Sequence, residues 1–444
     1  MTEELPEGWV HVALEAVLSH TIGGVWGKQA GEDELDARVL RVTEFGENTL
    51  LNPETGVIRS VTKRQLSARQ METGDLLLEK SGGGPNKPVG RVVLVRSEPT
   101  EVAVPTNFVQ LLRPNMEVVL PSFLAWQLDW WHKSGVAESL QRATTNIRNL
   151  QTKAYLGHRL VLPPRTEQER IAMAIEEHLS RLDAAEAALE GANRRLNSLL
   201  TSTLISVCSG SWATAPLSEV VHSVKNGVFV SRPGVDPPGH PIFRISAVRP
   251  LVLHTDDVRY AEPVPAKAEN YRVEVGDVLF TRYSGNADYV GAAAVVPADG
   301  AGVLHPDKLI RVITDTDRVL PEWLAAYVAA GEGRKEIEKR LKTTAGQVGI
   351  SGSQLKTVPI ATPPLEYQRR AVAHLQTLQH QRDLAARELA TATSRSASLR
   401  RSILSAAFSG QLVPQDPGDE PASVLLKRIA AEQPVKKPPK KKAS

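Results

Sequence analysis

Two stretches of sequence, 200 residues apart, decide the fold of this 444-residue chain. Residues 163–210 read PPRTEQERIAMAIEEHLSRLDAAEAALEGANRRLNSLLTSTLISVCSG, and residues 363–410 read PPLEYQRRAVAHLQTLQHQRDLAARELATATSRSASLRRSILSAAFSG. Each stretch begins with a proline pair, which bars helix upstream, and ends with a glycine, which stops one. Between them, apolar or small residues recur in alternating steps of four and three, the spacing of a coiled coil. We therefore predict two long helices, over about 166–209 and 366–409.

The predicted seam of these helices is rich in alanine, so one helix alone would bury too little apolar area to be stable. It includes Leu189 and Leu199 in the first helix and Leu389 and Leu399 in the second. Pairing of the two helices with each other is the economical solution. The sequence does not fix their direction, but globular segments at opposite ends require an antiparallel pair. Leu189 and Leu389 would then lie close to the point where the helices cross.

The repeat extends over nearly the whole chain. Its matched positions are Trp9 and Trp212, Gly74-Asp75 and Gly276-Asp277, Val89-Gly90 and Val290-Gly291, and Leu120-Pro121 and Leu320-Pro321. The matches stay in order, and their offset drifts only from 203 to 200 residues. A period this long is not that of a solenoid. The chain is a tandem duplication of one unit, a globular segment followed by a long helix.

The fold class that follows is α+β, with two strand-rich α/β segments separated by an antiparallel coiled coil. We divide the chain into a first globular segment (1–165), a first helix (166–210), a second globular segment (211–364), a second helix (365–412) and a C-terminal tail (413–444). Within the globular segments, Gly74-Asp75 and Gly276-Asp277 each lead into an apolar strand. The apolar runs 90–95 and 291–296 suit central strands, and 120–135 and 320–331 suit helices entered through a proline.

Composition excludes several classes of protein. The hydrophobic fraction of 41% and the charged fraction of 23% are ordinary for a folded protein. No apolar run reaches the roughly 18–20 residues that a membrane span needs. A single cysteine, Cys208, permits no internal disulfide and no cysteine-rich zinc site. A reducing, cytoplasmic location is the expectation.

The net charge of +3 depends on the end of the chain. Without the five lysines in 436–442 it becomes −2. This lysine- and proline-rich end is expected to be disordered, since proline breaks helix and clustered lysines repel. A case for nucleic-acid binding must therefore rest on local basic patches.

Motifs for catalysis are missing. Asp236-Pro237-Pro238-Gly239 has glycine where a methyltransferase loop needs an aromatic residue, and Gly82–Lys87 lacks the spacing of a P-loop. Pro306-Asp307-Lys308 is not followed by the acidic residues of a nuclease, and the eleven histidines form no metal-binding spacing. We expect no catalytic residue, no metal site and no cofactor. Two matched copies without such motifs point to binding.

Four short motifs occur in a characteristic order. They are Leu5-Pro6-Glu7-Gly8-Trp9, Leu162-Pro163-Pro164 with Glu167-Gln168, Gly276-Asp277-Val278-Leu279-Phe280-Thr281-Arg282, and Ala406-Ala407-Phe408-Ser409-Gly410-Gln411-Leu412. Over about residues 1–412 the chain resembles the specificity subunits of type I restriction-modification systems. It departs from their pattern at Arg165-Thr166, at Tyr367 where glutamate is usual, and at Ser211-Trp212.

The resemblance implies a non-catalytic DNA-binding subunit that serves defence against foreign DNA. Its two target recognition domains, the globular segments, would each read half of a split duplex target, with the paired helices as spacer. Two methyltransferase (M) subunits and the restriction/motor (R) subunits would dock on it.

Side chains that could read DNA are donors, acceptors and cations in the expected loops. In the first segment they are Trp26, Lys28, Lys80, Ser81 and Lys87, with Thr145 and Asn146; in the second they are Lys225, Asn226, Arg232, Arg244, Arg282, Tyr283, Ser284 and Asn286, with Thr344 and Gln347.

Two other functions fit the residues. A duplicated coiled-coil scaffold that binds only protein partners predicts no affinity for duplex DNA beyond the lysine tail. A divergent methyltransferase predicts cofactor binding by the isolated chain.

Overall fold

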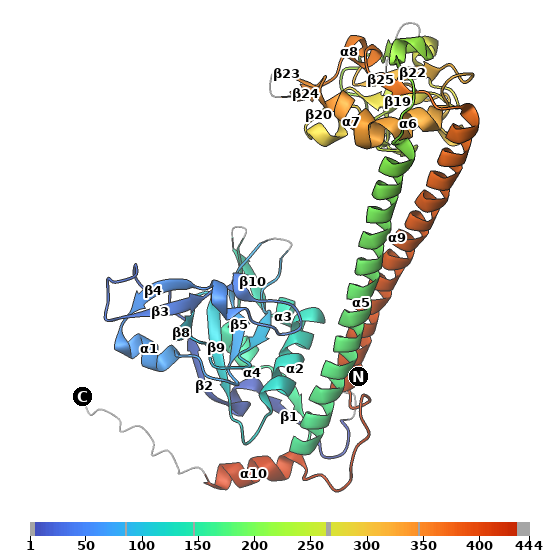
Figure 1. Ribbon diagram of the computed structural model, residues 1–444. Coiled ribbons are helices and arrows are strands. Elements are labelled where there is room, and N and C mark those ends of the chain that lie inside the picture. The colour runs from blue at the N-terminus through green and yellow to red at the C-terminus, as the bar shows by residue number, and fades with distance from the viewer. Residues whose placement is uncertain (1–4, 85–86, 145–146, 263–267, 345–346, 433–444) are drawn as a thin grey trace. The chain divides into compact units, whose positions relative to one another are not determined.

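The computed structural model describes residues 5–84, 87–144, 147–262, 268–344 and 347–432 (Figure 1). It divides into two compact units, each with its own core. Unit 1 comprises Met1–Glu186 with Thr391–Ser444, and unit 2 comprises Ala187–Ala390. Each unit thus contains one globular segment and part of both long helices.

Unit 1 is built on a four-stranded antiparallel sheet in the order β2 (Leu18–Gly23), β9 (Val109–Pro114), β5 (Leu76–Glu79) and β7 (Val92–Leu94). The smaller sheets are β4 (Val57–Val61), β3 (Leu35–Leu40) and β8 (Ala103–Pro105); β10 (Gln141–Thr144), β11 (Ile147–Leu150) and β6 (Ser81–Gly83); and β1 (Val10–Ala13) with β12 (Arg159–Leu162). The short helices are α1 (Lys63–Arg69), α2 (Pro121–Lys133), α3 (Val136–Ser139) and α4 (Thr152–Gly157).

Helix α2 supplies much of the core of unit 1. It begins at Pro121, whose fixed φ suits the first turn of a helix. Trp126 and Trp131 are buried and Trp130 is half-buried. The sequence therefore located this helix correctly, and most of its tryptophans belong to the core.

Unit 2 repeats the strand order of unit 1. Its main sheet runs β14 (Val221–Asn226), β22 (Leu309–Thr314), β19 (Val278–Thr281) and β21 (Ala293–Val295). The smaller sheets pair β13 (Thr214–Pro216) with β25 (Pro359–Ala361), β15 (His240–Phe243) with β18 (Val258–Ala261), and β16 (Val248–Arg249) with β17 (Val252–Leu253), and join β20 (Tyr283–Ser284), β24 (Gln347–Gly349) and β23 (Lys342–Thr344). The short helices are α6 (Pro321–Ala329), α7 (Gly331–Glu338) and α8 (Gly352–Lys356).

One strand prediction was wrong in both units. The apolar runs 90–95 and 291–296 suited central strands, but β7 and β21 are the last strands in the order of their sheets. They are nevertheless buried, because α2 packs on β7 and α6 packs on β21. A helix that covers an edge strand therefore leaves the same apolar signature as a central position in a sheet.

The two long helices are α5 (Arg165–Cys208) and α9 (Leu365–Phe408), of 44 residues each. In unit 1, Ile171 and Ile175 near the start of α5 share a core with Leu404 near the end of α9. There Arg400 also forms ion pairs with Asp183 at 2.5 Å and with Glu186 at 3.1 Å. The start of α5 thus packs against the end of α9.

In unit 2, the end of α5 packs against the start of α9. The Tyr367 hydroxyl donates to the backbone oxygen of Val207 at 2.8 Å, and Leu204 shares a core with Val372 and Leu375. The two helices therefore run antiparallel and form the expected coiled coil.

The predicted seam was wrong in the middle of α5, where Leu189 is 37% exposed, and toward the C-terminal part of each helix. Leu199 is 49% exposed and Leu399 is 51% exposed. In α5 the buried residues there are Leu200, Leu204 and Cys208, because this end packs on the core of the globular segment. A strict heptad also drifts around a straight helix by about 20° per repeat, so the buried face shifts over four heptads.

The tail holds a helix that the sequence analysis did not predict, α10 (Ala422–Glu432). Its Ala422, Leu425 and Ile429 belong to the core of unit 1, and Asp419 just before it pairs with Arg170 at 2.6 Å. The lysine- and proline-rich end, 433–444, lies outside the described residues. No helix in the described part of the chain is long and apolar enough to cross a membrane.

Candidate nucleic-acid interface

In unit 1 a three-stranded β-ribbon includes Ser81, one of the predicted DNA-binding residues. Strands β10 and β11 form a hairpin in which Thr144 pairs with Ile147. Strand β6, which begins at Ser81, adds to this hairpin, and Ser81 is hydrogen-bonded to Asn149. The predicted Thr145 and Asn146 lie outside the described residues.

Unit 2 carries the matching ribbon. Strands β23 and β24 form the hairpin, in which Thr344 pairs with Gln347. Strand β20 adds to it, with Tyr283 opposite Gly349. Four predicted residues (Tyr283, Ser284, Thr344 and Gln347) therefore share one small sheet. The repeat in the sequence is thus also a repeat of this ribbon.

Three of the remaining candidates of unit 1 have exposed side chains. Trp26 is 39% exposed, with the Arg59 guanidinium 4.8 Å from its ring centre. Lys28 is exposed but paired with Asp33 at 3.2 Å. Lys87 is exposed.

Lys80 directly precedes the ribbon strand β6 and is half-buried. Its Nζ lies 3.4 Å from Gln110 Oε1. Burial, with a contribution from the nearby charge of Arg69, lowers the pKa of Lys80 below its ordinary value. Among the cationic candidates of unit 1, this lysine is the least exposed to solvent.

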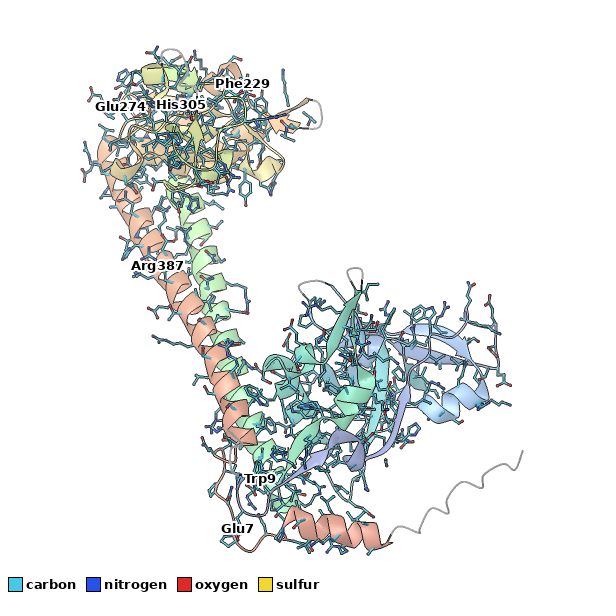
Figure 2. The ribbon with its side chains drawn as sticks, turned by 180° about the vertical axis from the view of Figure 1, so that it is seen from behind. Glu7, Trp9, Phe229, Glu274, His305 and Arg387 are labelled. Carbon is cyan, nitrogen blue, oxygen red and sulfur yellow. The ribbon has the colours of Figure 1, made fainter. Side chains whose placement is uncertain are left out.

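In unit 2, Lys225 and Asn226 lie exposed at the end of β14, and Arg232 is exposed in the following loop. Asn286 uses its side chain locally, where it accepts from the backbone N–H of Asp288 at 2.9 Å. Its backbone N–H also donates to the Ser284 Oγ in the ribbon strand β20 at 3.1 Å, whereas Arg232 belongs to none of the ribbon strands and is the weaker candidate. Phe229, between Asn226 and Arg232 on the chain, is 72% exposed and was missed from the sequence (Figure 2).

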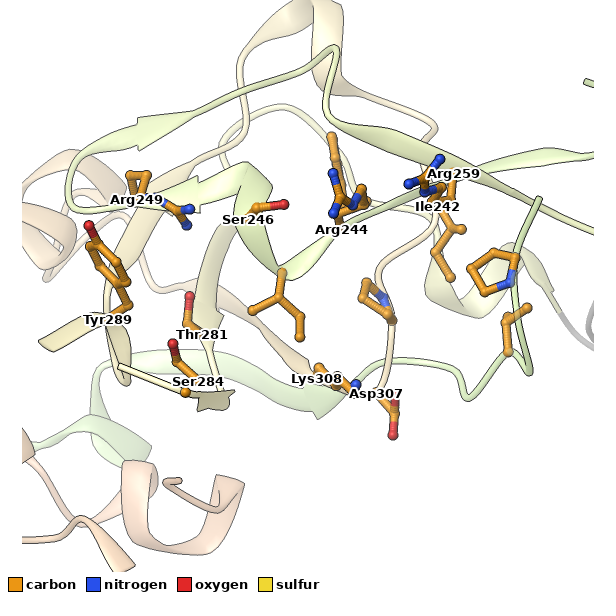
Figure 3. Close-up of a pocket in the computed structure, with 16 residues that line it drawn as sticks. Ile242, Arg244, Ser246, Arg249, Arg259, Thr281, Ser284, Tyr289, Asp307 and Lys308 are labelled. Carbon is orange, nitrogen blue, oxygen red and sulfur yellow. The ribbon is translucent and has the colours of Figure 1, made fainter. Parts of the chain in front are cut away.

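A pocket of about 520 Å³ lies in unit 2 beside the ribbon strand β20 (Figure 3). Its polar lining residues are Arg244, Ser246, Arg249, Arg259, Thr281, Ser284, Asp307 and Lys308. Of these, only Arg244 and Ser284 were predicted. The side chain of the predicted Arg282 is joined to this lining, since its Nη1 donates to the Asp307 backbone oxygen at 3.1 Å.

The pocket was missed because its cations come from separate elements. Arg249 lies in β16, Arg259 in β18 and Lys308 just before β22. Arg249 stacks on Tyr289, with 4.6 Å between the guanidinium carbon and the ring centre. No spacing in the sequence signals that these residues meet.

Buried His305 (Figure 2) directly precedes Pro306, which lines the pocket. Its Nδ1 lies 2.7 Å from the Tyr271 backbone oxygen. Burial lowers the pKa of His305 to about 4, so this ring is neutral at pH 7 and adds no charge to the pocket. Across the part of the chain that the structure describes, no cluster of three His, Cys, Asp or Glu could hold a metal ion.

Comparison with known proteins gives consistent relatives. The type I restriction enzyme EcoKI specificity subunit of Escherichia coli (strain K12) is 27% identical over 456 residues, which cover 97% of this chain and 96% of the relative. The StySPI specificity subunit of Salmonella potsdam is 25% identical over 465 residues, 99% of each chain. No protein-family model matches the chain.

A solved structure shares the fold. The HsdS subunit from Thermoanaerobacter tengcongensis aligns over 93% of this chain and 100% of that one, with a TM-score of 0.56 and 21% identity. The duplicated units and paired helices described above agree with that likeness. Over nearly its whole length, the chain is thus similar in sequence to the specificity subunits of type I restriction enzymes.

Proposed function

We propose that the chain is the DNA sequence-specificity subunit of a type I restriction-modification complex and performs no catalytic step itself. The observation that carries this proposal is the likeness to the EcoKI specificity subunit over 97% of the chain. The duplicated architecture supports it, since two related units suit a target in two halves.

Each globular segment (1–165 and 211–364) reads one half of the target. The major groove of B-DNA admits a two-stranded β-ribbon, and base edges are read there by donors and acceptors. Both units have such a ribbon, β10–β11 and β23–β24. We assign base reading to these ribbons, including Thr145, Asn146, Thr344 and Gln347, and to their neighbours on β6 and β20.

The paired helices set the spacing between the two halves. A helix of 44 residues is about 66 Å long at 1.5 Å per residue. Because DNA rises about 3.4 Å per base pair, helices of this size can hold two readers one or more DNA turns apart. In each unit, one end of α5 and one end of α9 pack into a hydrophobic core, which holds the helices in place.

The partners are duplex DNA, two methyltransferase (M) subunits and restriction/motor (R) subunits. The chain gives the complex its choice of sequence, and the M subunits supply methyl transfer. A scaffold that binds only protein is the alternative. The cation-lined pocket of unit 2 favours DNA, because a scaffold has no need of an arginine-rich concavity.

The test is methylation with and without this chain. The chain is co-expressed with its M subunits, and methylated bases are mapped across the genome. We expect a bipartite motif that disappears when this chain is omitted, and no methylation by the chain alone. Methyl transfer by the isolated chain, or an unchanged motif without it, would overturn the proposal.

A further inference from the structure

The pocket of unit 2 has an equivalent position in unit 1 that is built differently. The backbone hydrogen bonds identify the equivalent residues. The Lys80 N–H donates to the Phe108 oxygen at 2.9 Å, and the Arg282 N–H donates to the Lys308 oxygen at 2.9 Å. Lys308 thus introduces a cation where unit 1 has an apolar side chain.

The residues before these donors differ even more. The Glu79 N–H donates to the Arg91 oxygen and the Thr281 N–H to the Ala292 oxygen, both at 2.9 Å. In unit 1, Glu79 and Arg91 occupy the position with an ion pair of 2.8 Å. Thr281 and Ala292 carry no charge and are smaller, which leaves space in unit 2.

A second carboxylate is also missing from unit 2. In unit 1, Arg41 precedes a 3-10 turn and pairs with buried Glu44 at 2.8 Å. In unit 2, Arg244 precedes the equivalent turn, and Ala247 stands in place of the glutamate. Arg244 instead pairs with Asp257 at 3.0 Å, at the surface.

The resulting pocket is strongly positive. Four cations line it, against the carboxylate of Asp307 in the lining and that of Asp257, which pairs with Arg244 (Figure 3). Within the described residues, neither Arg259 nor Lys308 forms an ion pair with a carboxylate. A pocket of this charge attracts an anion.

The pocket also holds a polar group that lacks a partner. Thr281 is 1% exposed, and its Oγ1 is buried without a hydrogen-bond partner among the described residues. The Ser246 Oγ, in the same lining, is also buried and unpaired there. A buried unpaired hydroxyl costs about 1–3 kcal/mol as a class, so its presence points to a ligand that pairs with it.

The shape selects the kind of anion. The convex parts of a DNA duplex are its sugar–phosphate backbones, whereas base edges lie inside the grooves and need a protruding reader. A concave pocket beside the ribbon strand β20 therefore suits the backbone. We propose that this pocket binds a phosphodiester group of the DNA strand that flanks the half-site of unit 2, with Arg259 and Lys308 supplying charge and Thr281 a hydroxyl donor.

This assignment rests on the proposed function and makes the two units unequal. Unit 1 fills the equivalent position with its own ion pairs and makes no such phosphate contact there. Because phosphate contacts fix position and affinity but carry no sequence information directly, the pocket should govern binding strength without changing the motif.

The first test compares the double variant R259A/K308A with the wild-type complex on a duplex that carries the mapped motif. The slope of log K against log salt should become shallower by about 0.9 for each phosphate that the variant no longer neutralises. Affinity at about 0.1 M salt should fall about tenfold. The variant K335A, which removes an exposed cation of unit 2 paired with Glu332, should leave the slope unchanged.

The second test uses T281V, which removes the hydroxyl and keeps the shape. The free chain should be as stable as wild type or more stable, because an unpaired buried hydroxyl is removed. Its affinity for DNA should nevertheless fall several-fold. A merely structural role for Thr281 would give the opposite result, with lower stability and unchanged affinity, and would overturn its assignment.

A third arm distinguishes DNA from a free phosphate compound. Thermal stability of the full chain is measured with inorganic phosphate and with a mononucleotide. Strong stabilisation by these compounds that disappears in R259A/K308A, with an unchanged DNA salt slope, would overturn the DNA assignment.

An unchanged salt slope and unchanged DNA affinity in all variants, with the motif intact in the wild type, would overturn the assignment of the pocket but leave the proposed function standing. Absence of sequence-specific DNA binding by the wild-type complex would instead remove the proposed function itself.

Discussion

The side chain of Gln168 is hydrogen-bonded to the backbone of Leu120, with Oε1 accepting from the Leu120 N–H at 2.8 Å. Gln368 and Leu320 repeat this bond at 2.8 Å in the other unit. Leu120 and Leu320 stand directly before α2 and α6, so each glutamine fixes the start of a core helix to a long helix. The duplication thus preserves the joint between the globular segment and the coiled coil.

Replacing either glutamine by leucine should weaken its own unit. Gln368→Leu leaves the Leu320 N–H and the backbone oxygens of Arg318 and Pro363, which Nε2 contacts at 2.9 and 2.8 Å, without their partner. We expect a loss of about 2–4 kcal/mol in the free energy of unfolding. Denaturant unfolding measures this, with Gln376→Leu, an exposed position on α9, as the matched control. Equal stability of the two variants would contradict this role.

The buried histidine of unit 2 predicts a specific dependence on pH. Burial lowers the pKa of His305 from 6.5 to about 4, so the unfolded chain binds a proton at a higher pH than the folded chain. The neutral, buried His305 ring therefore contributes about 3 kcal/mol to the free energy of unfolding above pH 6.5. This contribution is lost as the pH falls toward 4.

His305→Gln should remove this part of the acid sensitivity. Between pH 6.5 and 4 its free energy of unfolding should fall less steeply than that of the wild type. Exposed His222→Gln is the control and should follow the wild-type curve. If H305Q and the wild type lose stability in parallel, the folded chain holds a protonated His305 and the prediction is wrong.

A third prediction concerns the helices. Inserting four residues after Leu189 in α5 and four after Leu389 in α9 adds about one turn, or 6 Å, to both. The methylated motif should keep both half-sites and gain roughly two base pairs of spacer. Insertion into α5 alone should abolish methylation, because it breaks the antiparallel register. A spacer of unchanged length after the double insertion would show that the helices do not set it.

The long helices could be predicted closely from the sequence. Proline pairs before them, glycines after them and a heptad pattern between them are local signals, and the structure begins and ends both helices within two residues of the prediction. The exposed Leu199 and Leu399 show the limit of that pattern. A repeat in the sequence indicates that a face is apolar, but the neighbouring globular core decides which residues are buried at each end.

Helix α10 was missed although a signal existed. Ala422, Leu425, Leu426 and Ile429 have the spacing of an apolar helix face, but the proline- and lysine-rich residues beyond them dominated the interpretation of the tail. The pocket of unit 2 had no comparable signal. Arg249, Arg259 and Lys308 meet only through the tertiary fold, and the absence of Glu79 and Arg91 from the equivalent position is visible only once hydrogen bonds align the two units.

The central claim is that each globular segment reads its own half of a divided target. Replacing residues 211–362 by the corresponding segment of a homologous specificity subunit, in the assembled complex, tests it most directly. Genome-wide mapping of methylated bases should show one half of the motif changed and the other half and the spacer retained. The reciprocal replacement of residues 1–165 should change the other half alone. If either replacement alters both halves, or neither, the two segments do not read DNA independently and the account is contradicted.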